Sequence, residues 1–327
     1  MTAITPNDIC YSTARDGDNP FNTDGQRRTE LPADLARSAF DFNILKKPNF
    51  DERGRQIPWQ FHLEKDTDGS LIPSTSVGAK FTPIQHIDVF DYIVNEVMPE
   101  VPGLKLEMAG TIHGGGTSLI AAKFGDTFSL PGDTSPNEMR LFFRNPCNGT
   151  GRMTLGFTTV RVVCQNTLLA ATQEAAQDGW TIKHTKSGPE MTSAAVHAIH
   201  GQARAALEIK ERCRLLAETG IDGATFRRCL DAVYPVDSLP EGHARSRLEN
   251  LRDEVVRQFE SGETARTMKT KSAWAAFNSF TYPIFNPPRL RKGEDLAQVQ
   301  YKAQMGDKAR RVSDIFAKVE RIAVYAA

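Results

Sequence analysis

The stretch that decides the fold is Leu104-Lys105-Leu106-Glu107-Met108-Ala109-Gly110-Thr111-Ile112. Polar and apolar side chains alternate along it, and this period of two predicts a half-buried strand. Gly114-Gly115-Gly116 follows, and residues 119–124 are apolar enough for a returning strand, so we expect an antiparallel hairpin. Residues 139–145 and 152–164 repeat the strand pattern. Together these stretches predict an antiparallel sheet.

Helical patterns flank the predicted strands on both sides. Thr82-Pro83-Ile84-Gln85 has the spacing of a capping box with proline at the first helical position, and helical periodicity follows until Pro99. A second helix is expected to begin near residues 165–167. Beyond Trp180 the segments 190–218, 222–234, 243–260, 265–282 and 309–325 all have helical periodicity. The fold class predicted is α+β, with a small antiparallel sheet flanked by helices.

The chain divides into three regions by composition. Residues 1–70 are rich in Asp, Asn, Gly and Pro, which is typical of turns, and we expect an extended N-terminal arm with short ordered pieces. Residues 71–180 hold the predicted α+β core. Residues 181–327 form the predicted helical C-terminal region.

Composition and charge limit the class of protein. The 327 residues carry 40 Lys and Arg against 40 Asp and Glu, but the balance is uneven along the chain. Through Trp180 there are 16 basic and 22 acidic residues, and the remainder has 24 and 18. This asymmetry is compatible with nucleic-acid contact, with head-to-tail assembly or with a solvated helical region. No apolar run is long enough for a membrane span, no secretory signal is recognisable, and five widely spaced cysteines indicate reduced thiols. We therefore expect a cytoplasmic protein.

Three motifs suggest catalysis or ligand binding, and each has a simpler structural explanation. Gly114-Gly115-Gly116 lies between strands with no Lys after it, which favours a hairpin turn over a phosphate loop. His197 and His200 share a predicted helix but lack a third ligand, so no metal site is predicted. Cys164 follows an apolar strand and has no evident base, which favours a buried strand end over a nucleophile. We expect no catalytic residues and no cofactor.

The polar face of the strands carries the more informative pattern. Cations and hydroxyls alternate there with apolar residues, and such a face could follow a phosphate backbone without selecting a sequence. Glu107 interrupts it, and an ordinary solvated sheet face would also carry Arg and Thr. The residues predicted to bind nucleic acid are Lys80, Lys123, Arg140, Arg144, Arg152 and Arg161.

A dense aromatic run in the C-terminal region has two interpretations. Trp274, Phe277, Phe280, Tyr282 and Phe285 lie between basic residues, an arrangement that can stack bases. The same residues follow helical spacing, which favours core packing.

Three blocks of sequence resemble a known family. They are residues 77–85, residues 159–168 with Arg161-Val162-Val163-Cys164-Gln165-Asn166, and residues 271–278 with Trp274. These blocks resemble the phage/plasmid-like family of unknown function called DUF932, although His86 stands where that family would have Asn. The resemblance implies a gene of phages, plasmids or prophages and brings no established catalytic residues.

The order helix, strands, helix is similar to the core of Rad52-like single-strand annealing proteins, although none of their motifs is matched. This similarity implies rings or filaments that hold single-stranded DNA beside the sheet. We therefore expect a non-enzymatic, homo-oligomeric protein that binds single-stranded nucleic acid in recombination or DNA protection. The alternative is a protein-interaction module, such as a host-defence inhibitor or a virion protein. An enzyme that uses Cys164 or a metal stays open as a third class.

Overall fold

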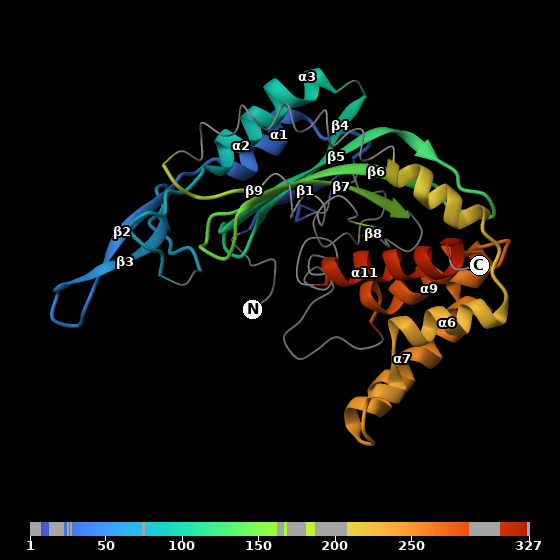
Figure 1. The fold of residues 1–327 in the computed structure, drawn as a ribbon. Coiled ribbons are helices and arrows are strands. Elements are labelled where there is room, and N and C mark those ends of the chain that lie inside the picture. Colours follow the sequence, from blue (N-terminus) through green and yellow to red (C-terminus); the bar gives the residue numbers. More distant parts are fainter. Residues whose placement is uncertain are drawn as a thin grey trace.

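The computed structural model describes residues 8–12, 23–24, 26, 28–73, 76–101, 103–161, 167–168, 181–186, 208–287 and 308–325. Its centre is a curled antiparallel sheet with helices on either side (Figure 1). A two-stranded hairpin projects from one end of the sheet, and a helical region lies at the other end. The predicted α+β class, with its helical C-terminal region, is confirmed.

The predicted strands form the middle of the sheet. They are β4 (Leu104–Ile112), β5 (Thr117–Phe128), β6 (Asn137–Pro146) and β7 (Met153–Arg161). Each pairs antiparallel with the next, because short turns join them. The strand β1 (Cys10–Ser12) adds to β4, and both β8 (Thr167–Leu168) and β9 (Thr181–Ile182) pair with β7. The residues Gly114 to Gly116 lie in the β4–β5 turn, as the sequence predicts.

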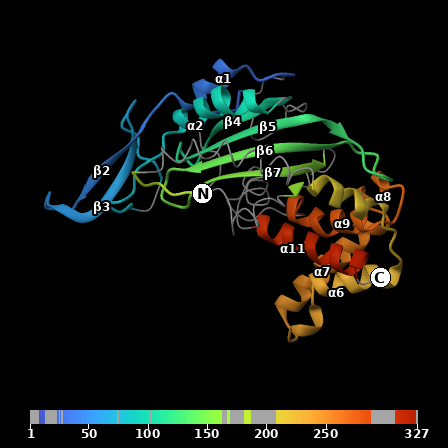
Figure 2. The same cartoon turned by 45° about the horizontal axis from the view of Figure 1, so that its top comes forward.

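Helices cover the sheet on two sides. In both views α1 (Ala33–Arg37) and α2 (His86–Tyr92) lie on one side, with helices of the C-terminal region on the other (Figures 1 and 2). A π-helical turn (Ile93–Val97) and α3 (Met98–Glu100) extend α2. Phe40, Phe90 and Leu141 are buried in one cluster with Phe277 and Phe316 of the helical region. The sheet and the helices on both sides therefore share one hydrophobic core.

The start of α2 differs from the sequence prediction. The helix begins at His86 with Gln85 as its N-cap, and no side chain caps it. The amide of Gln85 instead bonds both the backbone N–H and the carbonyl of Ile44, at 2.8 and 3.1 Å. Residues 81–85 are outside the helix, and the backbone of Gln85 is extended. The capping-box prediction is wrong because a long-range contact takes the side chain that would have capped the helix.

The first 70 residues form more than an extended arm. They include β1, α1, a 3₁₀ turn (Ser38–Phe40), and the hairpin of β2 (Ile44–Phe50) and β3 (Gln56–Lys65). Ile44 and Leu63 pack at the base of the hairpin with Ile72, Val77 and Cys147 in a separate small core. The base of the hairpin is therefore held by its own hydrophobic core, and the distal part extends away from the sheet (Figures 1 and 2).

The C-terminal region is helical, with residues 208–218 followed by named helices. These are α6 (Gly223–Val233), a 3₁₀ turn (Val236–Ser238), α7 (His243–Glu260), α8 (Glu263–Thr267), α9 (Ala273–Phe285), α11 (Ala309–Glu320) and a π-helical turn (Arg321–Tyr325). The predicted helix 265–282 is divided, because Met268 forms a bridge with Asp133 of the β5–β6 loop. The indole Nε1–H of Trp274 donates to the carboxylate of Asp133 at 3.0 Å. These contacts fix the helical region to the far end of the sheet.

Candidate functional site

Two of the predicted nucleic-acid-binding residues lie in a group of alternating charges in the middle of the sheet. Lys123 and Arg140 are directly opposite each other on β5 and β6. The Lys123 ammonium contacts Glu138 at 2.9 Å, and Arg140 contacts both Glu138, at 2.9 Å, and Glu107, at 2.7 Å. We call these four residues the ion-paired patch. Two carboxylates balance two cations, so the patch offers little net positive charge to a phosphate backbone.

The ion-paired patch is only partly accessible. The side chain of Glu138 is 8% exposed and that of Arg140 23%. Burial raises the pKa of Glu107, and the nearby Arg140 opposes that rise. Burying a carboxylate costs free energy, and the loss of its cation would leave that buried charge uncompensated. Arg140 is therefore held by structural interactions within the sheet.

Three other predicted residues, Lys80, Arg144 and Arg152, gather where the hairpin leaves the sheet. Arg144 of β6 is opposite Thr154 of β7, which in turn is opposite Thr181 of β9. Arg152 precedes β7, and the register of Met153 with Ile182 places Arg152 opposite Lys183.

Lys80 reaches the same place from the segment after the hairpin. The ring of Phe81 stacks on His184 with centroids 5.1 Å apart, and the Thr82 N–H donates to the His184 carbonyl at 2.9 Å. Lys80 therefore lies beside the segment Lys183 to Lys186. We call this region the hairpin end, and its cations are Lys80, Arg144, Arg152, Lys183 and Lys186.

The hairpin end includes exposed lysines that the sequence analysis missed. Lys80, Lys183 and Lys186 are exposed, and none of them forms an ion pair with the part of the chain that the structure describes. The run Lys183-His184-Thr185-Lys186 was the available signal, but the sequence placed it at the start of the helical region. The short strand β9 instead brings it beside β7.

Several predicted residues lie outside what the structure describes. The side chain of Arg161, at the end of β7, is one of them. Cys164, His197 and His200 are the others. The predictions for these four residues stay predictions.

A buried polar cluster lies under the hairpin end. The Cys147 thiol donates to the Ile84 carbonyl at 2.8 Å, and its sulfur is 4.0 Å from His86 Nδ1 and 3.9 Å from His184 Nδ1. The Asn145 amide donates to the same carbonyl at 2.8 Å and lies 3.2 Å from His86 Nδ1. These contacts join three segments that are distant in sequence.

The chemistry of this cluster is that of a structural network. Burial raises the pKa of the Cys147 thiol, so the thiolate that a nucleophile requires is disfavoured. Burial lowers the pKa of His86 and of His184 to about 4, which keeps both rings neutral near pH 7. His86 Nε2 lies 2.9 Å from the Gly115 carbonyl, and His184 Nδ1 accepts the Ile84 N–H at 3.2 Å. Both rings are thus engaged with the backbone.

The glycine turn binds a carboxylate of the chain itself. The N–H groups of Gly114 and Gly115 donate to the two carboxylate oxygens of Asp8, at 3.0 and 2.7 Å. Both glycines have positive φ, at 66° and 85°, a conformation that orients successive N–H groups toward one anion. Because Asp8 occupies these donors, the turn is a structural anchor for the N-terminal segment.

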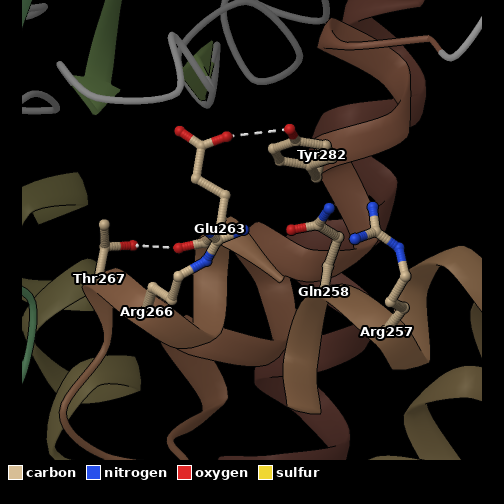
Figure 3. Close-up of a pocket in the computed structure, with 6 residues that line it drawn as sticks. All are labelled: Arg257, Gln258, Glu263, Arg266, Thr267 and Tyr282. Atoms are coloured by element: carbon tan, nitrogen blue, oxygen red, sulfur yellow. Dashed lines mark hydrogen bonds between the residues drawn. The ribbon is translucent and has the colours of Figure 1, made fainter. Parts of the chain in front are cut away.

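A separate pocket of about 370 Å³ lies in the helical region (Figure 3). Its lining residues are Arg257, Gln258, Glu263, Arg266, Thr267 and Tyr282. The Tyr282 hydroxyl donates to Glu263 at 2.9 Å, and the Thr267 hydroxyl donates to the Glu263 carbonyl at 2.8 Å. Arg257 is paired with Glu254 at 2.6 Å. The polar groups that line this pocket therefore bind one another or neighbouring residues of the helical region.

The aromatic run of α9 forms part of the core. Trp274, Phe277, Phe280 and Phe285 are all buried, as helical spacing favoured. Within the described ranges no group of three His, Cys, Asp or Glu side chains is placed to hold a metal ion. The described helices include none that is both long and apolar enough to cross a membrane.

Comparison with known proteins identifies the family but no relative of known function. No curated protein and no solved structure matches the chain. The model of the family described as a domain of unknown function, DUF932, matches residues 73–305, which include strands β4 to β9, the buried cluster and most of the helical region. The chain therefore belongs to the DUF932 family.

Proposed function

We propose that this protein binds single-stranded nucleic acid, and that the hairpin end makes the phosphate contacts. The observation that supports the proposal most strongly is the convergence of cations from separate segments. Lys80 follows the hairpin, Arg144 and Arg152 flank the β6–β7 turn, and Lys183 and Lys186 follow β9. Lys and Arg supply sequence-independent affinity for a phosphate backbone. Lys183 and Lys186 thus join the three predicted cations at this end, and the ion-paired patch is not required for the contact.

The surface at the hairpin end is supported from beneath. Cys147 and His184 are buried directly below it, and the stacking of Phe81 on His184 joins the two segments that carry its exposed lysines. Contacts that are held in place before binding lose less conformational entropy when a ligand arrives. A strand lying across this end would therefore meet lysines on a fixed platform.

The proposed function also includes self-association and a role in the host cell. We propose a non-enzymatic role in recombination, similar to single-strand annealing, or in DNA protection, in the cytoplasm of a host that carries a phage or plasmid. Self-association into a ring or filament is part of it, because the two halves of the chain have opposite charge balances. A protein-interaction module is the competing function, and the following experiment separates the two.

The test is a titration of a labelled single-stranded oligonucleotide with the full chain at several salt concentrations. Neutralising three to five phosphates should give a slope of log affinity against log salt of roughly −2 to −3.5. Fluorescence anisotropy measures the affinity at each salt concentration. Absence of binding at low salt would refute the proposal and favour the protein-interaction module.

A further inference from the structure

Trp59 is the most exposed of the large apolar side chains in the described part of the chain. Its exposed fraction is 77%, and Phe50 on the other strand of the hairpin is 58% exposed. Trp and Phe normally contribute more to folding than other residues when they are buried. Two neighbouring strands of one projecting hairpin therefore present aromatic rings to solvent at a cost in folding free energy.

The backbone at Trp59 is also unusual. Its φ is 64°, in the left-handed region that bulky residues rarely adopt. Among described residues other than glycine only His113 shares this feature. His113 lies in a turn, whereas Trp59 lies in the part of β3 where the pairing with β2 shifts register between Pro48 and Phe50. Strained conformations of this kind persist where surrounding structure enforces them, and they concentrate at functional sites. An exposed ring in a strained strand indicates a side chain that is presented for contact.

The surroundings of Trp59 indicate what it contacts. Arg53 is exposed on the same hairpin. Lys47 and Arg55 are exposed as well, although each forms an ion pair, with Glu64 at 3.7 Å and with Asp51 at 2.8 Å. The hairpin projects from one end of the sheet (Figures 1 and 2). Its base packs on Cys147, which lies between Arg144 and Arg152 in the chain. Exposed aromatic rings on a hairpin that also carries cations match the chemistry of a single strand, which has bases to stack and phosphates to neutralise. The alternative occupant, an apolar protein surface, would not use these charges.

We propose that Trp59, with Phe50 of the same hairpin, forms a stacking platform for the unpaired bases of a single strand whose phosphates lie on the hairpin end. This inference rests on the proposed function and adds the recognition of bases to it. Duplex bases are already stacked on one another, so the platform favours single strands over duplexes. Every base has a π-face, so the platform stacks bases of any sequence.

The test compares two probes of equal length: an oligomer of deoxythymidine and an abasic sugar–phosphate strand. We expect Trp59→Ala in the full chain to weaken binding of the deoxythymidine oligomer roughly 5- to 150-fold and to leave binding of the abasic strand unchanged. Trp59→Phe should retain most of the affinity, because it retains a ring. Leu71→Ala is the matched control, since Leu71 is 66% exposed at the base of the same hairpin, and it should change neither affinity.

The outcomes separate this inference from the proposed function. If Trp59→Ala binds both probes as the unmodified chain does, the stacking platform is refuted and the phosphate contacts stand. If the unmodified chain binds neither probe, the proposed function fails and this inference fails with it. If Trp59→Ala changes the oligomeric state in light scattering and leaves affinity unchanged, the hairpin contacts another copy of the chain, which also overturns the inference.

Discussion

The ion-paired patch and the hairpin end contain the same kinds of residue and differ in what surrounds them. In the patch, Lys123 and Arg140 are partly buried against Glu107 and Glu138. At the hairpin end, Lys80 and Lys183 are exposed and have no carboxylate partner in the described residues. Cations thus serve the stability of the sheet in one place and remain available to a ligand in the other. Pairing and exposure, more than residue type, therefore decide whether a cation can bind a ligand.

The largest effect of a single substitution should follow from breaking the ion-paired patch. Arg140→Ala leaves Glu107 and Glu138 as partly buried carboxylates that have lost their shared cation. Removing one partner of a buried ion pair costs about 3–5 kcal/mol, and the partial exposure here places the loss near the lower value. Urea denaturation measures the free energy of unfolding. The exposed Arg53 on the hairpin is the control, and Arg53→Ala should change stability by less than about 0.5 kcal/mol. Equal effects of the two substitutions would contradict the distinction.

Acidification should destabilise the support beneath the hairpin end. His86 and His184 have pKa values lowered from 6.5 to about 4 in the folded protein, so between these values the unfolded chain binds more protons. Stability is therefore present above pH 6.5 and is lost as the pH falls toward 4. The loss should be on the order of 3 kcal/mol for each histidine.

Thermal or urea unfolding between pH 7 and pH 4 measures this loss. His86→Gln, in which the amide replaces the ring's polar groups, should make the pH dependence shallower. Leu71→Ala, at an exposed residue with no titratable group, is the control and should leave the pH dependence unchanged. A pH dependence that stays the same in His86→Gln would show that His86 does not titrate in this way.

A smaller effect should follow at the far end of the sheet. Trp274→Phe keeps a large ring in the core but removes the N–H that donates to the buried Asp133 carboxylate. Loss of a hydrogen bond to a charged group costs about 1.5–3 kcal/mol. Denaturant unfolding measures the loss, and nucleic-acid affinity should be unchanged because the hairpin end lies at the opposite end of the sheet. Reduced affinity in a folded Trp274→Phe variant would contradict that separation.

The sequence predicted the sheet better than it predicted the site. The strands β4 to β7 were predictable because each alternates along its own length and short turns join them. The hairpin β2–β3 was missed, since Asp51 to Gly54 and Asp66 to Gly69 are turn residues that obscure the short apolar runs between them. The sequence pattern therefore predicted the strands that pair with a neighbour close in sequence.

The site depended on contacts that no local pattern contains. The side chain of Gln85 had the spacing of a helix cap, but Ile44 takes its hydrogen bonds. Likewise Cys147, His86 and His184 meet only once three segments have folded together. Whether a cation such as Arg140 is free or paired depends on Glu107 of another strand. Tertiary structure decides which groups these side chains contact. The alternation of polar and apolar residues could predict that the strand cations share one face of the sheet, but it could not predict which cations are paired with carboxylates and which are exposed.

The most direct test of phosphate binding at the hairpin end compares the salt dependence of single-strand binding in two variants. One combines Lys80→Ala, Lys183→Ala and Lys186→Ala at the hairpin end. The other is Lys105→Ala, an exposed lysine opposite Lys123 beside the ion-paired patch. We expect the first to make the slope of log affinity against log salt shallower by about 2, and the second to leave it unchanged. An unchanged slope in a well-folded triple variant would contradict the claim that the hairpin end binds the phosphates.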